Sequence, residues 1–396
     1  MATSVPTPAE GTAPVITGTG RCLPDDVLSN EDVAVMADPA RLEAWVTAST
    51  WCKARLAEEP ARRGSPDALH RRIFAEYIER RIGIRTRRVI DRAALLAGRP
   101  SSRDVHAADL GAGAARQALE AARVSPADID VVVVGTSTPG RIYPATAVQV
   151  QHLVGAEGAY AFDLSAACSS FVYGLELVRG LIRSGAARRA LVVAAEYFTA
   201  GVDYRDPTFS YFFGDAGAAA VVEASDLARG KPGWRIVDVR CRSQWSRNIR
   251  TGLGGTESLL AARGAAARGE TDPPPGDPAS PWFFQNGPSV YRDVVPLVAR
   301  ETLALLEDHR LRTDDVRLYL FHQASALMLD GIQERLFGGP LAPERLVVNL
   351  ERYGNTSSCG VALGLAEEKT ARPGELACLA TFGAGYTLGT ALLRKV

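Results

Sequence analysis

Three side chains of this chain could together carry out covalent chemistry: a thiol, an imidazole and an amide. Cys168 stands where an apolar run meets a helix pattern, His322 follows a second apolar run, and Asn355 lies in a Gly-Asn-Thr-Ser turn. A thiol at a helix N-terminus faces the positive end of the helix dipole and free backbone N–H groups, which lower the thiol pKa. A cysteine nucleophile with His and Asn partners is typical of thioester chemistry.

Composition limits the classes of function. The 396 residues carry 45 basic and 45 acidic side chains, so nothing indicates nucleic acid as a partner. The six cysteines are scattered without a CxxC pair, which argues against a zinc site or a disulfide framework and favours a cytoplasmic protein. No charge-free apolar run reaches the roughly 18 residues of a membrane span, and the N-terminus lacks a signal pattern. We therefore expect no membrane partner and no metal.

Apolar runs of strand length alternate with helix patterns along the chain. The predicted strands are Ile129–Val134, Ala190–Ala195, Ala218–Val222, Leu318–Phe321, Leu346–Val348 and Leu376–Ala380. The predicted helices are Ala107–Ala122, Ser170–Ser184, Val290–Asp308 and Ala326–Leu336. This alternation predicts an α/β fold in which helices cover the sheets.

The chain also contains an internal sequence repeat. The motif Phe213–Val222 is similar to Phe382–Ala391, and the segment around Cys168 is similar to residues 348–366. The repeat is far too long for a solenoid and predicts two homologous halves related by a pseudo-twofold axis. The active site is then expected at their junction, with residues from both halves.

These similarities define the expected domains. Residues 1–13 are predicted to be a flexible tail, 14–225 the N-terminal half and 226–396 the C-terminal half. One insertion, at about 38–72, is predicted to be helical and peripheral. Another, at about 260–281, is rich in Ala, Gly, Pro and Asp and is predicted to be a flexible loop.

Taken together, the motifs resemble the β-ketoacyl-acyl-carrier-protein synthase III (KAS III) branch of the thiolase superfamily. The segments that carry the resemblance are Ile16–Pro24, Arg81–Arg88, Asp163–Cys168, Phe213–Ala218, His322–Ala324, Gly354–Ser357 and Phe382–Gly385. They occur in the family's order, and the resemblance extends over nearly the whole chain outside the tail and the insertions. The resemblance implies the thiolase fold, with two pseudo-symmetric halves in a five-layered αβαβα sandwich.

The resemblance also implies a reaction and its residues. Cys168 would take an acyl group from a CoA or acyl-carrier-protein thioester, with the backbone N–H groups of Cys168 and Ala384 as oxyanion hole. His322 and Asn355 would bind a malonyl-type thioester on its carrier protein and stabilise the enolate formed as carbon dioxide leaves. That carbanion would attack the acyl-Cys168 in a decarboxylative Claisen condensation. No cofactor is bound permanently, since the CoA or phosphopantetheine thioester is itself the substrate.

Some positions depart from the family's nucleotide-binding pattern. Tyr77 stands where relatives that bind CoA often have a Trp that stacks on the adenine ring. Leu327 stands where relatives have an Arg that contacts the CoA phosphate. Arg81 matches a remaining family Arg, Arg205 partly compensates for another, and Ser325 replaces an Asn beside the pantetheine arm. Loss of cationic phosphate contacts favours a carrier-protein donor over CoA.

Tyr143 occupies the position from which family members project a residue into the acyl pocket of the other subunit. A homodimer is therefore expected. Relatives that condense without decarboxylation place a Glu base near this position, and a Tyr with a pKa of about 10 is a poor base. Phe209, Tyr211 and Phe213 are candidates to line the acyl pocket, although ordinary core packing explains them equally well.

Other functions stay open on the sequence. An acyltransferase on the same scaffold would pass the acyl group from Cys168 to a hydroxyl or amine, with His322 as general base, but relatives of that kind often replace the Asn. A papain-like hydrolase also uses Cys, His and Asn, yet lacks two similar halves. A non-catalytic partner subunit would usually lose the nucleophile. The insertions and altered contacts favour polyketide or other specialised metabolism over housekeeping fatty-acid initiation, by analogy alone.

Overall fold

The computed structural model describes residues 13–58, 65–251 and 282–396, and its centre is a nine-stranded sheet in the order β11-β12-β13-β8-β1-β7-β6-β4-β5. Five strands belong to the N-terminal part: β1 (Val15–Cys22), β4 (Val131–Gly135), β5 (Tyr160–Leu164), β6 (Arg189–Glu196) and β7 (Ala216–Glu223). Four belong to the C-terminal part: β8 (Trp234–Ser243), β11 (Leu318–Phe321), β12 (Leu376–Gly383) and β13 (Thr387–Lys395). The two sets meet where β1 pairs with β8.

The strand pairing of the first set recurs in the second. β1–β7 and β7–β6 are antiparallel and β6–β4 is parallel; β8–β13 and β13–β12 are antiparallel and β12–β11 is parallel. β5 completes the first set by pairing parallel to β4. Its counterpart is the segment that the sequence predicted as the strand Leu346–Val348, and that prediction is wrong. Leu346 forms only one parallel bridge, with Tyr319.

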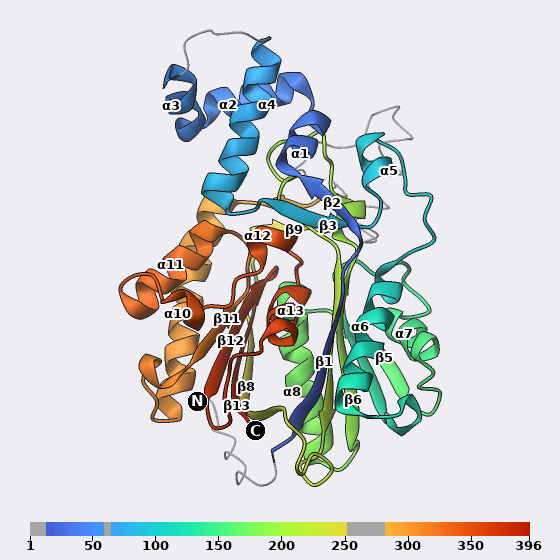
Figure 1. Cartoon of the computed structure of the whole chain (residues 1–396). Helices are drawn as coiled ribbons and strands as arrows, with labels where there is room; N and C mark the ends of the chain where they lie inside the picture. The colour runs from blue at the N-terminus through green and yellow to red at the C-terminus, as the bar shows by residue number, and fades with distance from the viewer. Residues whose placement is uncertain (1–12, 59–64, 252–281) are drawn as a thin grey trace.

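The helices form layers around and between these two sets of strands (Figure 1). α8 (Ser170–Arg183) and α13 (Cys359–Glu367) lie between the sets and contact strands of both. α6 (Ala107–Ala122) and α7 (Thr146–Val154) cover the outer face of the first set, and α10 (Gly287–Asp308) covers that of the second, with α11 (Ala326–Phe337) packed on α10. The result is the αβαβα sandwich expected from the resemblance.

Apolar composition explains why these elements pack as they do. The four valines of β4 are completely buried, as expected for a parallel strand covered on both faces. α6 buries ten of its residues, mostly Ala, which lets the helix lie close against β1 and β7. The predicted helices Ala107–Ala122 and Val290–Asp308 are confirmed, the second with three further residues at its start.

A cap of short elements covers one end of the sandwich, at the top of Figure 1. It contains α1 (Asn30–Met36), α2 (Pro39–Ala48), α3 (Thr50–Glu58), α4 (Pro66–Tyr77), α5 (Arg92–Leu96), and the two-stranded sheet of β2 (Asp26–Ser29) and β3 (Thr86–Val89). Where the structure describes the insertion at 38–72, in residues 38–58 and 65–72, it is mostly helical, as predicted. Residues 1–12 and the insertion at 260–281 lie outside the described residues.

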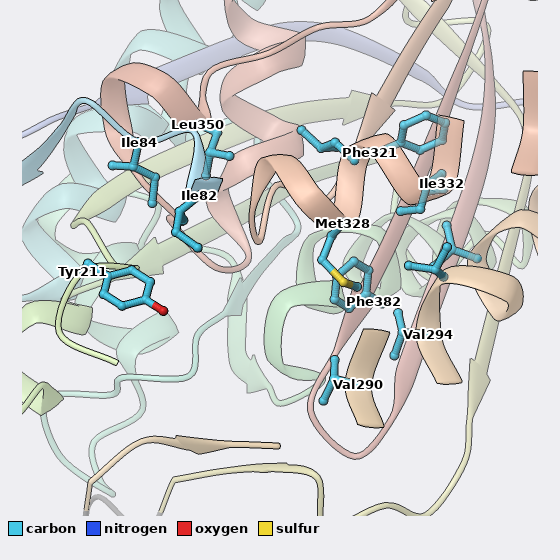
Figure 2. Close-up of a cluster of buried hydrophobic side chains, with 14 of the residues drawn as sticks. Ile82, Ile84, Tyr211, Val290, Val294, Phe321, Met328, Ile332, Leu350 and Phe382 are labelled. Carbon is cyan, nitrogen blue, oxygen red and sulfur yellow. The ribbon is translucent and has the colours of Figure 1, made fainter. Parts of the chain in front are cut away.

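The remaining elements are short: α12 (Leu350–Tyr353) and the two-stranded sheet of β9 (Ile249–Arg250) and β10 (Phe284–Gln285). The cap and the second half share one apolar cluster, part of which is shown in Figure 2. There, Tyr211 and Ile82 belong to the cap side, and Phe382 lies beside Met328 of α11. Within the described ranges, no helix is both long and apolar enough to span a bilayer.

Candidate active site

Cys168 lies in the short 3-10 turn Ala167–Ser169, which connects β5 to α8. Ala167 holds a left-handed backbone with φ of 48°. Non-glycine residues rarely adopt this conformation, and it recurs at functional sites. The turn leaves the Cys168 side chain partly exposed, at the wall of a pocket.

This pocket has a volume of about 550 Å³, within the usual range for small-molecule sites. Cys168 from the first half and His322 and Asn355 from the second all line it, together with Ala384 and Ser357. The structure thus brings the three predicted catalytic side chains and the predicted oxyanion-hole residue to one cavity between the halves. Its apolar walls come from Phe198, Phe213, Phe283 and Phe382.

His322 follows β11 and is 2% exposed. Its backbone N–H donates to the Ala380 carbonyl at 2.8 Å, and its ring meets Phe382 edge-on, with the ring centroids 4.8 Å apart. Burial lowers the pKa of His322 to about 3. The imidazole is therefore neutral at physiological pH and has one N–H to donate.

The turn that carries Asn355 is fixed by backbone hydrogen bonds to the other half. The Asn355 N–H donates to the Phe212 carbonyl at 2.8 Å, and the Asn355 carbonyl accepts from the Gly214 N–H at 3.1 Å. The side-chain oxygen accepts from the Ser357 N–H at 2.9 Å. This bond sets the amide orientation and leaves the NH2 group as the one that Asn355 can offer to a ligand.

Gln323, the residue after His322, holds the segment that leads to this turn. Its side-chain oxygen accepts from the N–H groups of Asn349 and Leu350 at 2.8 and 2.7 Å, and its NH2 donates to the Val347 carbonyl at 2.7 Å. Val347 still donates its N–H to the Tyr319 carbonyl of β11 at 3.0 Å, but the Val347 carbonyl is bonded to the Gln323 side chain and the pairing does not continue as a strand. The three Gln323 bonds couple the position of His322 to that of the Asn355 turn.

The pKa of the Cys168 thiol differs from the expectation. Although part of the residue is exposed to the pocket, the protein around Sγ desolvates the thiolate and raises the pKa of Cys168 to about 12, whereas the helix terminus was expected to lower it. The physical reason is that α8 begins only at Ser170, so an intervening turn separates the thiol from the helix, and desolvation of the thiolate dominates. The Ser357 hydroxyl donates a hydrogen bond to Sγ at 3.4 Å.

The four residues predicted to line the acyl pocket lie in four different environments. Phe213 lines the pocket, and Phe209 packs behind it against Phe283. Tyr211 does not line it, because its ring packs against the aromatic rings of the cap within the apolar cluster. Tyr143 is 83% exposed and lies outside the pocket of its own chain.

The predicted nucleotide-binding residues do not line the pocket either. The Tyr77 ring has edge contacts with Trp45, Trp51 and Tyr211, at centroid distances of 4.8, 5.8 and 6.3 Å. Arg81 is exposed in the π-helical turn Ile78–Ile82. Two others have local partners: Arg205 pairs with Asp203, and Ser325 caps α11 by accepting from the Met328 N–H.

Several pocket residues were not predicted. Ser357 was part of a recognised motif, but nothing in the sequence indicated that its hydroxyl reaches Sγ. Trp245, Arg247 and Ile249 line the pocket from the segment after β8, which has no residue pattern that marks a site. In the part of the chain that the structure describes, no group of His, Cys, Asp or Glu is arranged to hold a metal ion.

Comparisons with known proteins agree with this geometry. Family models described as 3-oxoacyl-(acyl-carrier-protein) synthase III and its C-terminal domain match residues 162–244 and 306–395. The chain is 34% identical over 322 residues to a β-ketoacyl-(acyl-carrier-protein) synthase III of Roseiflexus castenholzii, covering 81% of this chain and 89% of the relative. It is 36% identical over 288 residues to a β-ketodecanoyl-(acyl-carrier-protein) synthase of Pseudomonas aeruginosa, covering 72% and 79%.

Comparison with solved structures indicates the same family. The 3-oxoacyl-(acyl-carrier-protein) synthase III of Aquifex aeolicus superposes with a TM-score of 0.72 at 26% identity, covering 96% of this chain and 99% of that chain. The priming β-ketosynthase of the R1128 polyketide pathway superposes with a TM-score of 0.73 at 29% identity, covering 100% and 99%. The chain therefore belongs to the 3-oxoacyl-(acyl-carrier-protein) synthase III family, the condensing acyltransferases of the thiolase superfamily.

Proposed function

We propose that this protein transfers an acyl group from a thioester to Cys168 and condenses it with a malonyl-type thioester, with loss of carbon dioxide. The observation that carries the proposal is the convergence of Cys168, His322 and Asn355, from two halves of the chain, on one cavity. Family membership supports the reaction class. The roles of the individual residues rest on the geometry of this site.

The condensation half-reaction needs hydrogen-bond donors at the oxygen where negative charge develops. A neutral His322 and the NH2 group of Asn355 are such donors, and both are held before substrate arrives. Fixed donors of this kind stabilise an enolate without reorganisation, and each is typically worth about 3 kcal/mol. A His with so low a pKa is a poor general base, which counts against acyl transfer to a hydroxyl or amine.

A two-stage assay tests this function. The protein is first incubated with acyl thioesters, and intact mass shows whether Cys168 becomes acylated. Malonyl-carrier protein is then added to one portion and a hydroxyl or amine acceptor to another. We expect a β-ketoacyl product and carbon dioxide only with the malonyl thioester. Acyl transfer without malonyl consumption would favour the alternative, and an unacylated Cys168 would exclude both reactions.

We also propose that the acyl donor is a carrier-protein thioester and not acyl-CoA. The ring of Tyr77 has edge contacts with Trp45 and Trp51 of the cap helices, so packing within the cap accounts for it without an adenine. Leu327 offers no charge where relatives have a phosphate-binding Arg, and Arg205 is paired with Asp203. Acylation rates with the same acyl chain on CoA and on a carrier protein test this choice. Equal or faster transfer from CoA would contradict it.

A further inference from the structure

The turn between β12 and β13 ends in Tyr386, a residue that the chemistry above does not use. Its side chain is 1% exposed. The Tyr386 hydroxyl donates to the Asp293 carboxylate of α10 at 3.1 Å and accepts from the side-chain NH2 group of Asn248 at 3.0 Å. Asn248 also donates to the same carboxylate oxygen, at 3.2 Å. These three side chains form one closed cluster, here called the Tyr386 cluster, at the end of the turn that carries Ala384.

The Tyr386 cluster connects this turn to a long helix and to the segment after β8. Asp293 belongs to α10, which packs against both β12 and β13 (Figure 1). The Asn248 carbonyl accepts from the N–H of Asn286, whose side chain caps the same helix. The backbone adds a further bond, from the Gln244 N–H to the Tyr386 carbonyl at 2.8 Å. The turn is thus held at its Tyr386 end by elements that carry no reacting group.

The next residue, Thr387, connects the same turn to the nucleophile. Its hydroxyl donates to the Ala166 carbonyl at 2.7 Å, and its carbonyl accepts from the Ser169 hydroxyl at 3.1 Å. Ala166 and Ser169 lie on either side of Cys168 in the chain. The loop that carries the proposed oxyanion donor is therefore bound to the Cys168 turn on one side and, through the cluster, to α10 on the other.

We propose that the Tyr386 cluster positions the backbone N–H of Ala384 for the oxyanion that forms when Cys168 attacks a thioester. Tyr386 does not line the pocket, so it is a positioning residue that acts through Ala384. The inference rests on the proposed function. An oxyanion hole works where its donors lie about 2.7–3.1 Å from the developing oxyanion. Supporting hydrogen bonds are what hold such donors within about 0.5 Å of the productive geometry.

The alternative is that the cluster only stabilises the fold. The Tyr386 ring belongs to the apolar cluster shared by the cap and the second half, and a Phe ring would fill the same space. A hydrogen bond from a buried hydroxyl to a carboxylate contributes to stability in either case. The two explanations differ in one respect. Only positioning predicts a selective loss of the step in which an oxyanion forms.

The test compares Tyr386→Phe with wild type and with Tyr204→Phe. Tyr204 is also buried, and within the described residues its hydroxyl has no hydrogen-bond partner, which makes it the matched control. Two rates are measured at Cys168: acylation by a thioester and alkylation by iodoacetamide, each followed by peptide mass spectrometry. Acylation passes through an oxyanion, whereas alkylation displaces iodide without forming one. Both rates depend on the access and the acidity of the thiol, so their ratio isolates the oxyanion hole.

We expect the maximal acylation rate of Tyr386→Phe to fall about 10- to 100-fold, less than for a deleted donor, because the Ala384 N–H is displaced and not removed. The thioester concentration at half-maximal rate should not change, since the cluster does not touch the substrate. Alkylation of Cys168 should not change either. Tyr204→Phe should stay within about twofold of wild type in both rates, because it loses no hydrogen bond.

Two substitutions of Asp293 test the same cluster from the helix. Asp293→Ala removes the acceptor of the Tyr386 hydroxyl and should lower acylation as much as Tyr386→Phe does. Asp293→Asn keeps an oxygen that can accept, so its acylation rate should stay within about threefold of wild type, the neutral acceptor being the weaker one. Circular dichroism confirms that each variant folds. If Tyr386→Phe does not fold, the two Asp293 variants decide the question.

An unchanged acylation rate in Tyr386→Phe, or an equal fall in acylation and alkylation, would overturn the inference while wild-type acylation leaves the proposed function intact. Equal acylation by Asp293→Ala and Asp293→Asn would also overturn it. Wild-type protein that is alkylated at Cys168 but acylated by no thioester would refute the proposed function, and this inference with it.

Discussion

The end of β12 approaches the nucleophile so closely that Gly383 has no room for a side chain. A Cβ at this position would lie 2.7 Å from the backbone nitrogen of Cys168 and 3.0 Å from the Ala167 Cβ. This approach brings the next residue, Ala384, to the pocket wall beside Cys168. The proposed oxyanion hole therefore depends on the distance between a strand of one half and a turn of the other.

Replacing Gly383 by Ala should separate these two segments. We expect a loss of about 1–3 kcal/mol in the free energy of unfolding from overpacking. Cys168 acylation should fall about 100-fold, because the oxyanion donors move apart. Gly360→Ala is the matched control, since its Cβ would meet nothing closer than 3.6 Å. Denaturant unfolding and acylation kinetics measure both effects. Equal behaviour of the two variants would show that the approach is not critical.

Asn355→Ala should separate the two half-reactions. It removes an amide donor proposed to act on the enolate, so malonyl decarboxylation and condensation should fall by about 10²–10³. Cys168 acylation should fall much less. Thr356→Val is a suitable control, because in the described structure the buried Thr356 hydroxyl has no hydrogen-bond partner. Radiolabelled carbon dioxide release measures the first step and intact mass the second. An unchanged release rate would remove Asn355 from the mechanism.

His322 should make stability depend on pH in a defined direction. Because burial lowers its pKa from 6.5 to about 3, the unfolded chain binds a proton in that interval that the folded chain excludes. The contribution of His322 to stability is thus present above about pH 6.5 and is lost as the pH falls toward 3. His322→Gln cannot take up this proton, so it should lose less stability on acidification, by up to about 1.4 kcal/mol per pH unit.

Urea unfolding of both proteins between about pH 5 and pH 7 measures this difference. Asp215, whose pKa burial raises to about 7, has the opposite dependence, but it is present in both proteins and cancels in the comparison. A constant difference in stability across this range would mean that the imidazole titrates normally.

Tyr77→Ala distinguishes a packing role from a nucleotide-binding role. If the ring only joins the cap to the body, the variant should lose about 2–3 kcal/mol of stability. Its KM should then remain unchanged for both acyl-CoA and acyl-carrier protein. If the ring binds adenine, KM should rise for acyl-CoA alone. Tyr77→Phe keeps the aromatic contacts and serves as the control. Steady-state kinetics with the two donors give the answer.

The expected homodimer can be tested at β5, the last strand of the described sheet. Its outer edge is free to pair with a second copy, and Tyr160 on it is 48% exposed. Tyr160→Lys should shift the protein toward monomer and reduce acylation, because Tyr143 would no longer reach the pocket of the other subunit. Tyr291→Lys, at a similarly exposed Tyr on α10, should leave the molar mass of the protein in solution unchanged. Light scattering after size exclusion measures both. A monomeric wild type would refute the dimer.

The helix α6 and the strand β4 could be predicted from the sequence alone, because local interactions determine them. The Ala-rich pattern of α6 and the valines of β4 specify their own structure, since propensity, periodicity and burial agree there. Leu346–Val348 was misassigned for the opposite reason. Its apolar residues suit a strand, but only the Val347 N–H bonds to the neighbouring strand, at the Tyr319 carbonyl, and the Val347 carbonyl accepts from the distant Gln323 side chain instead.

The sequence by itself determined the reacting residue types, the order of the motifs and the duplication that places them in two halves. Only the tertiary structure decided the acidities and the contacts of these groups. Burial set the pKa values of Cys168 and His322, and burial depends on which segments pack around a residue. Likewise, Ser357 lies 189 positions after Cys168 in the chain, and its hydroxyl reaches Sγ only because the two halves close on each other.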